Sequence, residues 1–123
     1  MILVDASVWI EHLRHRDAVL AHLIEEDAIL MHPYTIAEIG LGSLADRDQL
    51  IEQLESLPVA PVASHNEVMA LIGLNRLYGT GVGYVDCHLL TTALLIGGRV
   101  WTRDKRLMRE AERLRIAYTE QQT

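Results

Sequence analysis

The chain has 123 residues and a mass of 13.9 kDa, which is the size of one domain and excludes a multidomain enzyme. Half of the residues are hydrophobic and 23% are charged, a composition that suits a folded core and excludes a disordered tail. The formal net charge of −6 argues against strong general binding to nucleic acid, although most of the 11 Lys and Arg residues lie between residues 99 and 115.

The single cysteine, Cys87, cannot form an internal disulfide or a cysteine-built zinc site. The apolar run at the N-terminus has no basic leader, and the longest apolar stretch, near residues 89–98, is interrupted by Thr91 and Thr92. These features predict a cytoplasmic protein without a membrane-spanning segment, folded as a single domain over residues 1–123.

Short apolar runs alternate with helical patterns in the first half of the chain. A strand is predicted over residues 2–4, followed by a helix that Ser7 could cap and by a second helix that Asp17 could cap. Residues 28–31 form the next apolar run, and helical spacing returns over residues 35–44 and 48–57. The prolines within residues 58–62 exclude a helix and predict a third, edge-like strand.

The same alternation continues in the second half. Ser64 and Glu67 form a capping-box pattern before a helix that ends at the glycines of residues 79–83. A helix is predicted over residues 84–96, where Gly97 and Gly98 end it, and a fourth strand over residues 99–102. A helix over residues 105–114 follows, and residues 116–118 could form a last strand.

Strands that alternate with helices predict right-handed crossovers and a parallel sheet. We therefore expect an α/β fold with three layers, α/β/α, around a central parallel sheet of four to five strands. In such open sheets the binding crevice lies outside the carboxyl ends of the strands. Residues that follow a predicted strand are the first candidates for a functional site.

Four acidic residues follow or neighbour the predicted strand ends: Asp5, Glu38, Asp86 and Asp104. Taken singly, each has an ordinary structural role as a turn residue, a helix cap or an exposed charge. Taken together, convergent carboxylates would repel one another unless a cation neutralised them, and oxygen ligands suit Mg²⁺ or Mn²⁺. The pattern predicts a divalent metal site.

The segments VDASVW at residues 4–9, TIAE at 35–38, YVDCHLL at 84–90 and WTRD at 101–104 resemble, in order and spacing, the PIN-domain ribonucleases. The resemblance is strongest to the VapC toxins of bacterial and archaeal toxin–antitoxin pairs, and it extends from residue 1 to about residue 117. It implies a parallel sheet between helices and a Mg²⁺- or Mn²⁺-dependent endoribonuclease. The acidic site residues of the family then correspond to Asp5, Glu38, Asp86 and Asp104, and its supporting hydroxyls to Ser7 and Thr102. His88 departs from the small or aliphatic residue of many members, and its role stays open.

The chemistry of phosphodiester hydrolysis agrees with this resemblance, because a divalent ion activates water and takes up charge on the phosphate. Asp5 would be the central ligand. Ser7 and Thr102 each lie two residues from an aspartate and could bond to a carboxylate. Arg103 and Lys105 flank Asp104 and are predicted to contact the phosphates of the substrate.

The resemblance also implies a cognate antitoxin, an RNA substrate and a homodimer as partners. Trp9, Ile10 and Leu13 have the pattern of core residues. In such a toxin the first helices also contribute to the antitoxin and dimer surfaces, so a partner segment would lie along the helix of Trp9 and Leu13. A basic side chain of that segment would reach the carboxylates. The alternative function is a catalytically silent binding module of the same fold, and such a module would be recognised by the loss of an acidic ligand.

A haloacid-dehalogenase-like phosphatase is excluded because Ser7 stands where its second aspartate is needed. A response-regulator receiver is excluded because the lysine it needs after its last strand is missing, since Lys105 adjoins Asp104.

Overall fold

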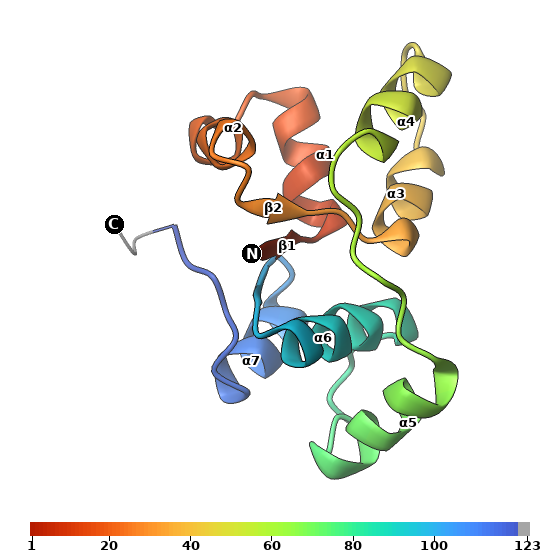
Figure 1. The fold of residues 1–123 in the computed structure, drawn as a ribbon, viewed down its shortest axis with the longest axis vertical. Coiled ribbons are helices and arrows are strands. Elements are labelled where there is room, and N and C mark those ends of the chain that lie inside the picture. The colour runs from red at the N-terminus through yellow and green to blue at the C-terminus, as the bar shows by residue number, and fades with distance from the viewer. Residues whose placement is uncertain (121–123) are drawn as a thin grey trace.

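The computed structural model describes residues 1–120, which form seven helices around a three-stranded parallel sheet (Figure 1). Strand β1 (Ile2–Val4) lies in the middle, between β2 (Ile29–Leu30) and β3 (Arg99–Trp101), and both neighbours run parallel to it. The predicted α/β fold with a parallel sheet is confirmed. The carboxyl ends of β1 and β3 lie side by side because Val4 pairs with Trp101.

The two outer strands expected over residues 58–62 and 116–118 are reduced to one bridge each. Val59 pairs with Met31 and Ala117 with Val100, both in the parallel sense. The two prolines near Val59 have no N–H to donate, so this segment cannot extend its ladder. The sheet formed by residues 1–120 therefore has three strands instead of four to five, with two further segments along its edges.

One face of the sheet is covered by the helices of the first half: α1 (Ala6–Arg14), α2 (Ala18–Glu25), α3 (Pro33–Gly40) and α4 (Arg47–Glu55). They lie above the strands in Figure 1. Val4 and Trp101 point from the strands into this layer and pack with Trp9, Leu20 and Ile39.

The opposite face is covered by α5 (His65–Leu74), α6 (Tyr84–Ile96) and α7 (Lys105–Arg113), which lie below the strands in Figure 1. Leu3 and Val100 point into this second layer and pack with Leu89, Leu90 and Leu107. Because Leu3 and Val4 are neighbours on β1, their opposite directions follow the alternation of a strand buried on both faces. The predicted three layers are confirmed.

Two helix starts differ from the sequence prediction. Asp5, and not Ser7, is the N-cap of α1, since its carboxylate accepts from the Ser7 N–H at 3.4 Å. His32 caps α3, where its Nδ1 accepts from the Tyr34 N–H at 3.0 Å. Helix α3 also ends at Gly40, earlier than the predicted residue 44, and residues 41–46 form turns and irregular backbone before α4.

The capping box before α5 is confirmed: the Ser64 N–H donates to Glu67 at 2.8 Å, and the Glu67 N–H donates to Ser64 Oγ at 3.1 Å. Helix α6 spans the predicted residues 84–96 and ends at Gly97, whose φ of 68° is left-handed backbone that glycine adopts without steric cost. Among the helices of residues 1–120, none is long and apolar enough to cross a membrane.

Candidate active site at the carboxyl ends of the strands

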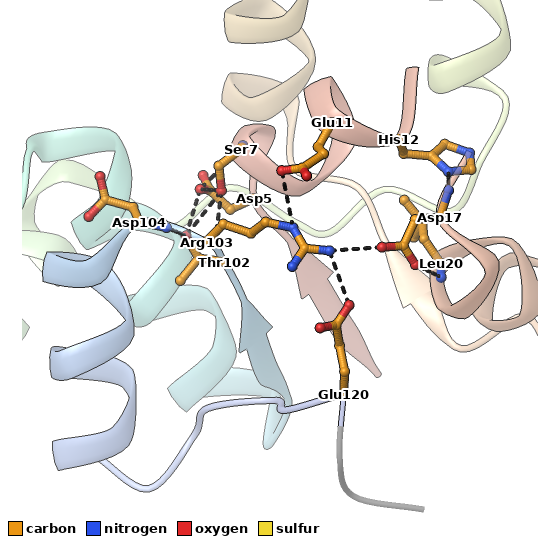
Figure 2. Close-up of polar contacts among 10 residues, drawn as sticks. All are labelled: Asp5, Ser7, Glu11, His12, Asp17, Leu20, Thr102, Arg103, Asp104 and Glu120. Atoms are coloured by element: carbon orange, nitrogen blue, oxygen red, sulfur yellow. Dashed lines mark hydrogen bonds and ion pairs between the residues drawn. The ribbon is translucent and has the colours of Figure 1, made fainter. Parts of the chain in front are cut away.

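Asp5 is the centre of a hydrogen-bonded group where β1 and β3 end. Its Oδ2 accepts from Ser7 Oγ at 2.7 Å and from Thr102 Oγ1 at 2.8 Å, and the side chains lie together in Figure 2. Each hydroxyl has one proton, so both protons are used on Asp5. Asp5 is 6% exposed and Thr102 is 2% exposed, which shields these charge-assisted hydrogen bonds from water.

The loop after β3 is fastened to the same group through its backbone. The Arg103 N–H donates to Ser7 Oγ at 3.0 Å, and the Asp104 N–H donates to Thr102 Oγ1 at 3.0 Å. Asp104 is also the N-cap of α7, where its Oδ1 accepts from two backbone N–H groups. The two hydroxyls therefore connect Asp5 on the first strand to Asp104 beyond the third.

Glu38 and Asp86 lie close enough to these carboxylates to change each other's ionisation. Burial, followed by the negative charges of Asp5 and Asp86, raises the pKa of Glu38. Burial also raises the pKa of Asp86, and the charges of Asp5 and Asp104 add to it, while the hydrogen bond from the Gly83 N–H opposes it. The structure thus brings Asp5, Glu38, Asp86 and Asp104 into one electrostatic group.

This acidic group fits a divalent cation by the chemistry of its donors. Oδ2 of Asp5 is saturated by hydroxyl protons, whereas within residues 1–120 no hydrogen bond reaches its Oδ1. Hard oxygen donors with excess negative charge are what Mg²⁺ and Mn²⁺ bind. The side chains are not a ready-made cage, because in the described part of the chain no three His, Cys, Asp or Glu residues form a group tight enough to hold a metal ion.

Arg103 and Lys105 have different surroundings. The Arg103 guanidinium extends away from Asp104 and makes ion pairs with three carboxylates, as Figure 2 shows: Glu11 at 3.6 Å, Asp17 at 2.8 Å and Glu120 at 3.0 Å. Hydrogen bonding to Glu120 is the main reason that the pKa of Arg103 is raised. Lys105 is exposed at the start of α7 and lines a surface pocket together with Thr102, Arg103 and Arg109.

A group of aromatic and histidine side chains next to the acidic group was not predicted from the sequence. His88 is 1% exposed, and neither of its ring nitrogens has a hydrogen-bond partner in residues 1–120. Its ring contacts His32, Tyr34 and Tyr84. Burial, with a smaller effect of His65, lowers the pKa of His88. The unusual histidine at position 88 was visible in the sequence, but its ring partners could not be predicted because they come from distant segments.

The expected apolar surface on the first helix is only partly present. Trp9 is 3% exposed and belongs to the core, as expected for an apolar residue of this helix. Leu13 is 39% and Ile10 is 36% exposed, and both line a groove with Ile39 and Leu44. The apolar surface that is accessible at α1 is therefore formed by the outer side of this helix and the segment after α3.

Comparison with known proteins gives consistent matches. The PIN domain family matches residues 2–114. Two curated proteins named Ribonuclease VapC32, from the CDC 1551 / Oshkosh and H37Rv strains of Mycobacterium tuberculosis, are each 48% identical over 122 residues, which covers 98% of this chain and 98% of each relative.

Solved structures share the fold at lower identity. PAE2754 from Pyrobaculum aerophilum has a TM-score of 0.66 at 20% identity and covers 90% of this chain and 79% of its own. FitAcB from Neisseria gonorrhoeae has a TM-score of 0.62 at 24% identity over 91% and 94% of the two chains. FitAB bound to an IR36 DNA fragment has a TM-score of 0.64 at 21% identity over 100% of both.

Proposed function

The chain belongs to the PIN-domain family, and from its strand-end carboxylates we propose that it is a metal-dependent endoribonuclease that hydrolyses RNA phosphodiester bonds as the toxin of a VapBC-type toxin–antitoxin pair. The observation that carries this proposal is the position of Asp5, locked by Ser7 and Thr102 among three further carboxylates. Carboxylates this close together, with Asp5 buried among them, repel one another unless a cation is bound, and such a cluster is typical of a catalytic site.

Asp5, Glu38, Asp86 and Asp104 would hold Mg²⁺, with Mn²⁺ as a cation of similar ligand preference. When bound, the cation neutralises charge on the phosphate and makes water easier to deprotonate. Ser7 and Thr102 are positioning residues in this arrangement. Their hydroxyl protons bind Oδ2 of Asp5 and so fix the orientation of the carboxylate, including the position of Oδ1.

Lys105 and Arg103 are assigned to the phosphates of the substrate. Lys105 supports this assignment best, because it is exposed one residue after Asp104. The Arg103 side chain would have to leave its three carboxylate partners to reach a phosphate, so its contribution to binding is expected to be smaller. The backbone of Arg103 acts in any case through its hydrogen bond to Ser7.

The cognate antitoxin is assigned to the groove formed by Ile10, Leu13, Ile39 and Leu44. Exposed aliphatic side chains on α1 suit an apolar partner segment, and a basic side chain of that segment would be attracted to the acidic group. A homodimer in the cytoplasm, where the lone Cys87 stays reduced, completes the proposal.

The test is cleavage of single-stranded RNA by the purified protein, with and without Mg²⁺, beside the Asp5→Asn variant. Asn keeps the size of the side chain and removes the charge, so we expect activity to fall by orders of magnitude while the fold is retained. Asp27→Asn is the matched control: it is the same chemical change in an exposed turn with φ of 53°, a conformation that asparagine adopts readily. Its activity should equal that of the wild type.

Two results would contradict the proposal. Equal rates for wild type and Asp5→Asn would remove Asp5 from the active site. Failure of the wild type to cleave RNA in Mg²⁺ or Mn²⁺, with the fold intact, would favour the catalytically silent binding module.

A further inference from the structure

Two tyrosines and one histidine form a fixed aromatic group at the N-terminal ends of α3 and α6, which lie close together on the right of Figure 1. The ring centroid of His88 lies 4.7 Å from that of Tyr34 and 4.8 Å from that of Tyr84. Both contacts are edge-to-face, with interplanar angles of 72° and 83°. Buried His88 therefore holds both tyrosines through the geometry that aromatic pairs prefer.

The tyrosines are held in place but not buried. Tyr34 is 37% exposed and Tyr84 is 43% exposed, whereas His88 is 1% exposed. The Tyr84 hydroxyl adds a hydrogen bond of 2.7 Å to Nδ1 of exposed His65, which fixes the outer end of that ring. Rings that are both ordered and accessible are what proteins use to stack unpaired bases.

The aromatic group is adjacent to the proposed active site. Tyr34 and Glu38 are four residues apart in α3, so they lie on the same helix face, one turn from each other. Tyr84 begins α6 two residues before Asp86, and its ring contacts that of His88, which in turn contacts Tyr34. A ligand that placed a phosphate at the carboxylates would extend its neighbouring groups over these rings.

Charge makes a base contact more useful here than a phosphate contact. The chain carries a net charge of −6, and Glu38, Asp86 and Asp5 repel one another at the site. The polyanionic backbone of RNA gains little from such a surface without the cation. Stacking of an uncharged base needs no positive charge and gives affinity beside an acidic centre.

We propose that Tyr34 and Tyr84, held by His88, form a stacking site for an unpaired nucleobase next to the scissile phosphate. The inference rests on the proposed ribonuclease function and adds a base contact, made by named side chains, to the phosphate contacts proposed above. An apolar protein segment is the less favoured occupant, because aliphatic groups are provided separately by Ile10 and Leu13 on α1.

The first experiment measures kcat and KM for a short single-stranded RNA with Tyr34→Leu and Tyr84→Leu. Loss of one base stack is expected to raise KM about 5- to 150-fold, with kcat changed far less. Tyr34→Phe and Tyr84→Phe retain the ring and should recover most of the affinity. Tyr78→Leu is the matched control, because Tyr78 is 65% exposed and has no aromatic partner within residues 1–120.

The second experiment detects stacking directly and needs no catalysis. A short oligouridylate with 2-aminopurine at one position is titrated with protein in Ca²⁺, a hard cation that also binds carboxylate oxygens, and the position is moved along the strand. Stacking on a tyrosine quenches 2-aminopurine, so one position should show a quench that Tyr34→Leu or Tyr84→Leu removes and the Phe variants keep. An abasic nucleotide at that position should weaken binding to the wild type as much as the Leu substitution does, which tests the site without any change to the protein.

The outcomes separate this inference from the proposed function. RNA cleavage with the same KM in the wild type and both Leu variants, or an equal quench in all proteins, overturns the stacking site and leaves the ribonuclease standing. Loss of partner binding with unchanged RNA binding in the Leu variants would likewise overturn it, in favour of a protein contact. A quench that depends on the tyrosines supports the stacking site even if no cleavage is detected, in which case the catalytic proposal alone fails.

Discussion

Mild acid is expected to destabilise the protein through His32, the N-cap of α3. This histidine is 1% exposed, its Nδ1 accepts from the Tyr34 N–H at 3.0 Å, and its ring lies 5.7 Å from that of His88. Burial, and to a lesser extent the charge of His88, lowers the pKa of His32 from 6.5 to about 4. Protonation of Nδ1 would also break the capping hydrogen bond, because the cap needs an acceptor there.

The sign follows from proton counting. Between pH 6.5 and about pH 4 the unfolded chain protonates His32 while the folded protein does not, so the free energy of unfolding falls as the pH falls through that window. A shift of this size corresponds to about 3 kcal/mol over the whole window, of which about 2 kcal/mol is lost between pH 7 and pH 5. Glu38 and Asp86 act in the opposite direction, since their raised pKa values favour protonation of the folded state.

The comparison that isolates His32 uses His32→Asn, because asparagine can cap a helix but does not titrate. Urea unfolding at the two pH values, followed by fluorescence of buried Trp9 and Trp101, gives the pH-dependent loss for each protein. We expect the loss to be about 2 kcal/mol smaller in His32→Asn, because the other groups with shifted pKa values, His88, Glu38 and Asp86, are present in both proteins.

His15→Asn is the control, since His15 is exposed and its side chain makes no hydrogen bond or ion pair within residues 1–120. It should behave as the wild type does. Equal losses in the wild type and His32→Asn would refute a neutral, capping His32.

Two further predictions concern the proposed active site. Thr102→Val keeps the shape of a buried side chain and removes one proton donated to Asp5. Activity on RNA should fall about 10- to 100-fold, and the free energy of unfolding should fall by about 1–3 kcal/mol. Unchanged kcat/KM and stability would show that the hydroxyl is dispensable. Lys105→Gln should raise KM and reduce the slope of log KM against log salt concentration by about 1. Arg103→Gln should change this slope less, because the guanidinium is already paired with Glu11, Asp17 and Glu120. Equal slopes in the wild type and Lys105→Gln would contradict the phosphate contact.

The layer order of the fold could be predicted because its cause is local. Apolar runs of strand length alternate with helical periodicity, and parallel pairing then requires helices on both faces. The extent of the outer strands could not be predicted in the same way. Residues 58–62 have the composition of a strand, but whether a proline-containing edge makes one bridge or a full ladder depends on its partner, Met31.

The candidate site shows the same limit. The spacing of Asp5 and Ser7 and of Thr102 and Asp104 indicated which side chains belong together, because each pair is two residues apart at a strand end. The directions of longer side chains could not be predicted from the sequence. Arg103 is next to Asp104 in sequence, yet its guanidinium lies with Asp17, and that preference is decided by charges on α1, at the start of α2 and near the C-terminus.

The acidic residues of the proposed active site also have structural roles at helix N-termini. Asp5 and Asp104 are the N-caps of α1 and α7, and Asp86 accepts from the N-cap Gly83 of α6. Three helix N-termini therefore meet at one place, and their positive dipole ends offset part of the repulsion among the carboxylates. Because each cap uses backbone N–H groups that fix a carboxylate, the helices orient the acidic group before any cation binds. A change to asparagine retains this capping geometry and removes only charge, which is why it separates catalysis from folding, whereas a change to alanine would disturb both.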